Sequence, residues 1–268
     1  MNINNSIPSI FETVKTRSNI LSLNDKNHFF DKNKLIINTS RSLSERISEI
    51  NNHFGIAIEI NARSDKTLSI IKKTKNIDEV VSSSLFKRET KSVLHIIAEE
   101  EFIPIQHNST DLIYTVFGLD YINDLPGTLS QIHDALKKDG MFVAAFLGEG
   151  TLLPLADSFA IADEKILGGV HPRIHPFFEI KTLANLMHRL GFKDIVADQE
   201  KINKKYLNLK DLLFDIRSFG ITNLMTERRK QFTPASVFKI IERNLKKQSS
   251  IKPYFFMPFN ILFVSCWK

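Results

Sequence analysis

Short apolar runs recur along this chain with longer spacers between them, and this alternation restricts the fold more than any other feature. The runs cover residues 56–60, 79–83, 93–98, 111–117 and 141–147. Each run has the length of a strand, and the spacers leave room for helices. The alternation predicts βαβ units and a mostly parallel sheet with flanking helices.

Helix and strand signals mark the other parts of the chain. Ser42 and Glu45 have the spacing of a capping box, which predicts a helix from there to about Asn51. Apolar residues at helical spacing predict a helix from Leu125 to Leu136 that ends at Asp139 and Gly140. The remaining predicted elements are helices at 180–190, 209–219 and 234–247 and strands at 193–202 and 254–267.

We expect three parts in the domain organisation. Residues 1–50 are polar and predict an N-terminal helical extension, and residues 51–268 form the main α/β domain. Residues 148–178 are rich in glycine and proline and too long for a plain connection. We therefore interpret this segment as an insertion that covers a site.

Composition excludes several classes of protein. With 43% hydrophobic and 25% charged residues, the 268-residue chain has the composition of an ordinary globular protein. The single cysteine, Cys266, fits a reducing compartment. No apolar run reaches the roughly 18 residues that a membrane span needs, and Met1–Asn5 lacks the start of a signal peptide. We therefore expect a cytoplasmic protein without a membrane span.

Three sequence blocks resemble one family. The first comprises residues 98–104 and 109–114, and the second residues 121–126 and 131–140. The third is more specific, with GGVHPRIHPF at 168–177 and DIRSFGITN at 215–223. Together the blocks resemble class I S-adenosylmethionine-dependent methyltransferases. The third block is similar to bacterial relatives of a mitochondrial complex I assembly factor that hydroxylates an arginine, whose wider kin include the malonyl-acyl-carrier-protein methyltransferase of biotin synthesis.

The resemblance implies a Rossmann-like, seven-stranded sheet with the cosubstrate S-adenosylmethionine at the carboxyl ends of the strands. It assigns the cosubstrate side to residues that follow the first three strands of the predicted sheet: Glu59, Asn61, Arg63, Ser83 and Glu99. It assigns the substrate side to Arg173, His175 and Arg217. No catalytic residue is assigned.

The chain departs from the family pattern at the cosubstrate loop. Asn61, Arg63 and Asp65 stand where glycines are expected, although glycine there permits positive φ and a close approach of the backbone to the ligand. Asn61 is a tolerable substitute in a left-handed conformation. Ser83 lies where an acid normally accepts hydrogen bonds from the ribose, so that contact loses its charge-assisted strength. The cosubstrate loop is therefore degenerate. The sequence does not decide whether the chain binds S-adenosylmethionine weakly or not at all.

Other sites have less support. His171 and His175 are four residues apart, but the prolines beside them predict an irregular loop, and no further ligand motif completes a metal site. An RNA methyltransferase is a third possibility, and its only support is the net charge of +6. That charge by itself is weak evidence for a nucleic-acid partner.

Two functional hypotheses from different classes remain. The first is a methyltransferase-like protein that acts on a protein or carrier-bound substrate in complex I assembly. The alternative is a non-catalytic assembly or docking protein that keeps the fold. The sequence does not indicate an oligomeric state.

Overall fold

A computed structural model of the chain describes residues 9–25, 30–87, 93–220 and 222–268. The N-terminal segment Met1–Asn5 and Ile221 of the third sequence block lie outside the described residues. Among the described helices, none has both the length and the apolar composition needed to cross a bilayer.

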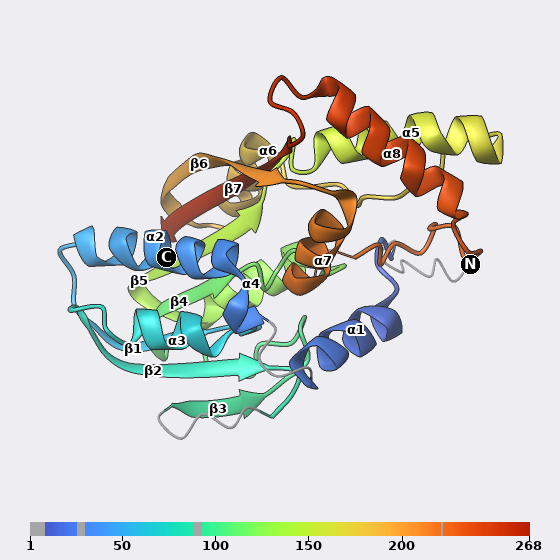
Figure 1. Cartoon of the computed structure of the whole chain (residues 1–268). Coiled ribbons are helices and arrows are strands. Elements are labelled where there is room, and N and C mark those ends of the chain that lie inside the picture. The colour runs from blue at the N-terminus through green and yellow to red at the C-terminus, as the bar shows by residue number, and fades with distance from the viewer. Residues whose placement is uncertain (1–8, 26–29, 88–92, 221) are drawn as a thin grey trace, which may run out of the picture.

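The centre of the molecule is a seven-stranded sheet with the order β3-β2-β1-β4-β5-β7-β6 (Figure 1). Strands β3, β2, β1, β4 and β5 are parallel to one another, and β7 is antiparallel to both β5 and β6. This architecture confirms the predicted Rossmann-like, mostly parallel sheet. The strands are β1 (Phe54–Glu59), β2 (Ile77–Ser84), β3 (Leu94–Ile97), β4 (Thr110–Val116), β5 (Leu136–Leu147), β6 (Lys193–Tyr206) and β7 (Phe255–Trp267).

Helices cover both faces of this sheet, because the central strands are apolar on both sides. One buried cluster joins the sheet to α2, α3, α5, α7 and α8, and a second joins it to α4 and α6. The helices are α1 (Thr13–Asp25), α2 (Lys34–Glu49), α3 (Asp65–Ile71), α4 (Leu125–Ala135), α5 (Leu153–Leu167), α6 (Ile180–Arg189), α7 (Leu209–Phe219) and α8 (Ala235–Gln248), with a short 3-10 turn η1 (Phe30–Lys32).

The predicted start of α2 was wrong. The helix begins at Lys34, where the Asn33 side chain accepts hydrogen bonds from the backbone of Leu35 and Ile36. Ser42 and Glu45 lie inside the helix. The buried positions of α2 begin with Leu35, so the apolar face of the helix starts more than one turn before Ser42.

The predicted end of α4 was also wrong. The helix ends at Ala135, and Leu136 already pairs with Thr110 as the first residue of β5. Asp139 has a φ of 63°, and a Cβ on Gly140 would lie 2.8 Å from the Lys137 carbonyl oxygen. The Asp-Gly pair therefore serves an irregular start of the strand and not the end of a helix.

The segment 148–178 contains a regular helix, α5, followed by an irregular loop. Helix α5 packs beside α8, and the two lie together beyond the strand ends (Figure 1). Helix α1 lies on another side, beyond the carboxyl ends of β2 and β3 (Figure 1). These two additions enclose the edge of the sheet where open α/β folds bind ligands.

Candidate functional site

The loop after β1 forms the centre of the site and is held by Asn61. This residue has a φ of 51°, as the substitution for glycine predicted. Its side-chain nitrogen donates to the carbonyl oxygens of Glu100 at 2.8 Å and Gly118 at 3.2 Å. Asn61 thus connects the loops that follow β1, β3 and β4.

Arg63 points inward from the same loop and is 6% exposed. Its Cζ lies 5.4 Å from the centroid of the Tyr121 ring, and its Nη1 would lie 3.4 Å from a Cβ on Gly220. Among the described residues, Nη2 has no hydrogen-bond partner, and no ion pair of this guanidinium is found. Within the described residues, this side chain is a buried cation without a direct carboxylate partner.

Two predicted cosubstrate residues bond to the protein itself. Glu59 is buried at the end of β1, where its Oε2 accepts a hydrogen bond from the Tyr114 hydroxyl at 3.4 Å. The Ser83 hydroxyl donates to the Glu59 carbonyl oxygen at 3.5 Å. Both side chains therefore consolidate the strand ends.

Glu99 lies outside the site. Its carboxylate is exposed and pairs with Arg17 of α1 at 2.9 Å. The next residue, Glu100, is buried, and burial raises the pKa of its carboxyl. Of these two adjacent acids, Glu100 is the one that lines the small cavity at the strand ends.

The space at the carboxyl ends of β1 and β2 is nearly filled by these side chains. A cavity of about 10 Å³ remains there. Ligand pockets for small molecules span about 300–1,000 Å³. The described residues therefore leave little room for a ligand between these strand ends. The lining residues are Ile20, Asn61, Ala62, Arg63, Ser84, Leu85, Phe86 and Glu100.

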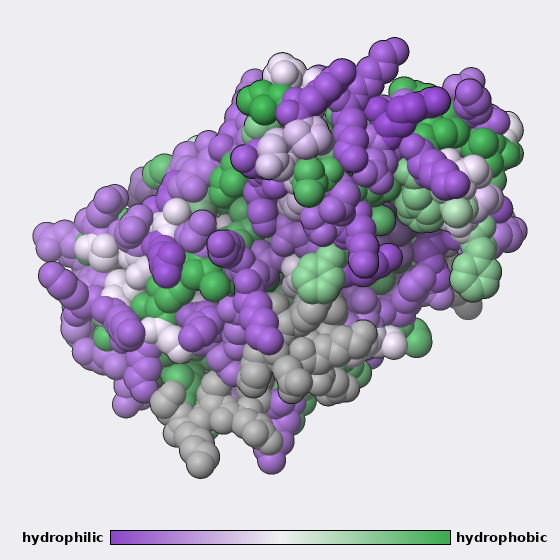
Figure 2. Space-filling model, viewed as in Figure 1, coloured by the Kyte–Doolittle hydropathy of each residue, from purple (hydrophilic) through white to green (hydrophobic). Residues whose placement is uncertain are grey.

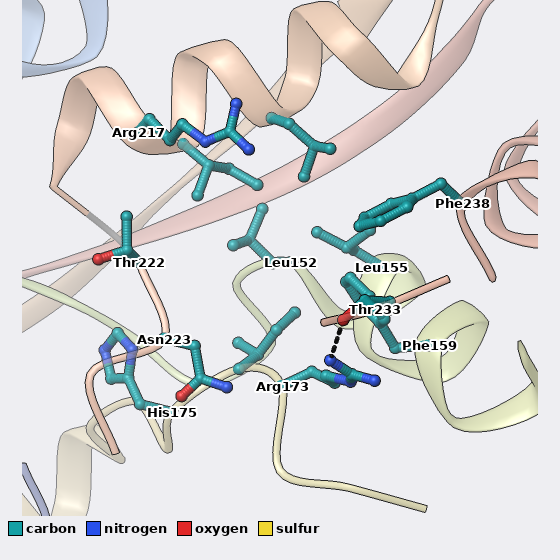
Figure 3. Close-up of a pocket in the computed structure, with 13 residues that line it drawn as sticks. Leu152, Leu155, Phe159, Arg173, His175, Arg217, Thr222, Asn223, Thr233 and Phe238 are labelled. Carbon is teal, nitrogen blue, oxygen red and sulfur yellow. Dashed lines mark hydrogen bonds between the residues drawn. The ribbon is translucent and has the colours of Figure 1, made fainter. Parts of the chain in front are cut away.

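A larger cavity of about 250 Å³ lies between α5, α7, α8 and the loop after α5 (Figure 3). We call it the α5–α8 cavity. It brings together Arg173, His175 and Arg217, the three residues that the resemblance assigned to the substrate side. The sequence analysis did not predict the apolar walls of this cavity. The helical spacing of Leu155 and Phe159 is the signal that could have predicted an inward-facing side of α5. The other lining residues are Leu152, Leu155, Ile174, Leu213, Ile216, Thr222, Asn223 and Thr233.

The three cavity residues are held differently. Arg173 donates from Nε and Nη2 to the buried Asp163 carboxylate at 2.7 and 2.8 Å, and from Nη1 to Thr233 (Figure 3). Arg217 projects from α7 on the wall of the cavity, and no side-chain hydrogen bond or ion pair of it is found within the described part of the chain. Arg173 therefore fixes the loop to α5, whereas Arg217 is available to an anionic group.

His175 and Tyr121 form the wall between the two cavities. The His175 ring is buried, 4.7 Å from the Tyr121 ring and 5.6 Å from the Phe11 ring. Burial lowers the pKa of His175 to about 4, so the imidazole is neutral near pH 7. Tyr121 in turn lies against Arg63, so an aromatic contact links the filled space to the α5–α8 cavity.

Asp120 is a buried acid that sequence reasoning did not assign to the site. Its Oδ1 accepts from the Leu147 backbone nitrogen at 2.8 Å, while Oδ2 and the Tyr121 hydroxyl have no partner among the described residues. Burial raises the pKa of Asp120 to about 7, against the opposing effects of the Leu147 N–H group and Arg63. Within the described residues, no cluster of three metal-ligating side chains is present.

Comparisons with known proteins give consistent results. The family described as "Methyltransferase domain" matches residues 36–197. The zebrafish (Danio rerio) protein named "Arginine-hydroxylase NDUFAF5, mitochondrial" is 29% identical over 84% of this chain and 72% of its own length. Malonyl-[acyl-carrier protein] O-methyltransferase 1 of Coxiella burnetii is 28% identical over 50% of this chain and 45% of its own length.

A solved structure shares the fold. Phosphoethanolamine N-methyltransferase 2 of Haemonchus contortus, in complex with S-adenosyl-L-methionine, superposes with a TM-score of 0.51 and 16% identity. The match covers 86% of this chain and 52% of the Haemonchus protein. The fold of this chain is thus that of S-adenosylmethionine-dependent methyltransferases.

Replacing Arg173 with methionine should lower the free energy of unfolding by about 3 kcal/mol, because the buried Asp163 carboxylate loses its partner. The double variant Arg173→Met/Asp163→Leu should recover most of this loss, since no buried charge remains. Urea titration measures both values. A double variant as unstable as the single one would show that packing, and not charge, causes the loss.

The stability advantage of the wild-type protein over Asp120→Asn should fall as the pH rises from about 4 to about 7. The folded-state pKa of about 7 exceeds the ordinary value of 3.8, so the folded protein holds an additional proton in this window. That stabilisation is complete below the unfolded pKa and lost as the pH passes the folded pKa, a change of about 4 kcal/mol at most. Unfolding free energies of both proteins across this range test it, and parallel curves would contradict it.

Proposed function

Because this chain belongs to the methyltransferase domain family, we propose that it binds a group carried by a protein in the α5–α8 cavity and acts in assembly without using S-adenosylmethionine. The resemblance of the third sequence block implies respiratory complex I as the assembly concerned. In this proposal the protein keeps the methyltransferase fold and uses the α5–α8 cavity to bind a partner protein.

The observation that carries the proposal is the filled space at the ends of β1 and β2. Arg63, Phe86 and Ile20 leave about 10 Å³ there. Ile20 belongs to α1, which is tied to the opposite side of the space by the pair between Arg17 and Glu99. The closure therefore involves a helix as well as a loop.

The α5–α8 cavity supports the docking part of the proposal. Its walls are mostly apolar, and Arg217 offers a cation to an acidic group. The far end of α5 adds exposed apolar side chains, among them Ile161, Ile166 and Val170, and apolar atoms gather there in Figure 2. An apolar pocket with a cation at its wall and apolar surface beside it fits a protein segment with an acidic residue.

The names of the relatives support a group carried by a protein. One relative is named for arginine hydroxylation and another for malonyl-[acyl-carrier protein]. This chain aligns with less than half of the second relative's length, so the activities in these names enter only as support for the class of substrate.

The second candidate function is S-adenosylmethionine-dependent transfer to such a group, with α1 displaced. One observation favours it: the Asp120 carboxylate and the Tyr121 hydroxyl keep unpaired atoms in the interior. Buried polar atoms without partners are costly and are typical of functional sites.

Calorimetric titration with S-adenosylmethionine separates the two candidates. We expect no heat of binding to the wild-type protein at about 1 mM ligand, because the site has no room; this limits the binding free energy to about 4 kcal/mol. Circular dichroism on the same sample confirms that it is folded. Binding at micromolar concentrations would contradict the docking proposal and support transfer.

Photo-crosslinking tests the α5–α8 cavity as the docking site. A photoreactive amino acid at Phe238, on the cavity wall, should crosslink a complex I subunit in cells that naturally encode this protein. The same group at Lys181, exposed on α6 away from the cavity, should crosslink that subunit several-fold less. Arg217→Glu should also reduce the yield at Phe238, because it reverses the charge offered to the partner. Equal yields at both positions would contradict the assignment.

A further inference from the structure

We infer that the Arg63 guanidinium replaces the sulfonium cation of S-adenosylmethionine, so that an internal cation holds the cosubstrate side of the fold together. This inference rests on the proposed function, in which the cosubstrate is not used. It adds a chemical reason for the arginine at a position where the family pattern has glycine.

The position of Arg63 is the first argument. Its loop follows β1, and its side chain reaches between Tyr121 after β4 and Gly220 after α7. Ligands of open α/β sheets bind in this crevice outside the carboxyl ends of the strands. Gly220 has a φ of 81°, and a Cβ there would lie 3.4 Å from Nη1 and 3.5 Å from the Phe30 ring. The guanidinium therefore packs directly against the glycine that ends α7.

Charge is the second argument. Two buried acids, Glu100 and Asp120, feel the charge of Arg63, which lowers the pKa of each against the larger effect of burial. S-adenosylmethionine carries one net positive charge at neutral pH, from a sulfonium, an ammonium and a carboxylate. A guanidinium carries the same net charge. The acids that would face a cationic ligand thus keep a cation of equal charge.

The way in which Arg63 is held is the third argument. Buried guanidinium groups normally form direct, often bidentate, pairs with carboxylates. Arg63 instead lies against the face of Tyr121, and among the described residues its Nη2 has no hydrogen-bond partner. A sulfonium has no N–H donor and is attracted only by ring faces and by charges at some distance. The surroundings of Arg63 supply those two interactions.

The test replaces Arg63 with glycine, which removes the cation and restores the residue of the family pattern. The Arg63→Gly variant should melt at a lower temperature than the wild-type protein. S-adenosylmethionine at millimolar concentration should raise its Tm by about 5 °C or more, and S-adenosylhomocysteine, which has a neutral thioether, should raise it far less. The wild-type Tm should not change with either compound.

A matched variant distinguishes the loss of the positive charge at position 63 from the space that a smaller side chain opens there. Arg63→Met keeps most of the bulk and loses the charge, so it should be destabilised without any response to S-adenosylmethionine. If Arg63→Gly does not fold, Arg63→Ala with millimolar methylguanidinium replaces it, and rescue of its Tm relative to equal sodium chloride supports the inference.

The outcomes distinguish the inference from the proposed function. Equal shifts of Arg63→Gly by both adenosyl compounds, or no shift of the folded variant, would overturn the replacement of the sulfonium and leave the docking proposal intact. A lack of rescue of Arg63→Ala by methylguanidinium would overturn it as well. A shift of the wild-type Tm by S-adenosylmethionine would contradict both.

Discussion

The geometry of the whole site depends on the hydrogen bonds of one side-chain amide. Asn61 ends β1 in a left-handed conformation and donates to the carbonyl oxygens of Glu100 and Gly118. A glycine at position 61 would allow the same backbone but would leave both buried oxygens without this donor, at a cost of about 1–3 kcal/mol for each unsatisfied group. Gly118 in turn must lack a side chain, because a Cβ there would lie 2.9 Å from Asn61. The loops after β1, β3 and β4 therefore form one junction.

This junction explains why the departures from the family pattern occur together. Two of the substituted residues have partners within the chain: Asn61 bonds two carbonyl groups, and the Ser83 hydroxyl bonds the Glu59 carbonyl. Unrelated losses of ligand contacts would leave unpaired groups throughout the site. These internal hydrogen bonds hold the strand ends together without a ligand, as the docking proposal requires.

The sequence predicted the sheet well and the site only in part. Strands and helices with strong periodicity, such as β4, α6 and α7, were confirmed because local apolar spacing determines them. Local signals misled at Ser42 and at Asp139, where cap-like residues served other purposes than ending a helix. Glu99 and Glu100 are adjacent acids, and only the packing of the loop decides which one is buried. Ile20 could not be placed at all, because α1 reaches the site through tertiary packing that no local pattern encodes.

An aromatic contact lies between the α5–α8 cavity and Arg63, which lines the small cavity at the strand ends. The contact consists of His175 and Tyr121, whose rings lie 4.7 Å apart, and Tyr121 supports the Arg63 guanidinium. A protein segment that enters the α5–α8 cavity contacts His175 directly, since that ring lines it. Burial keeps the His175 imidazole neutral near pH 7, so this part of the cavity wall carries no charge. The internal cation and the docking cavity of the two proposals therefore share one aromatic contact.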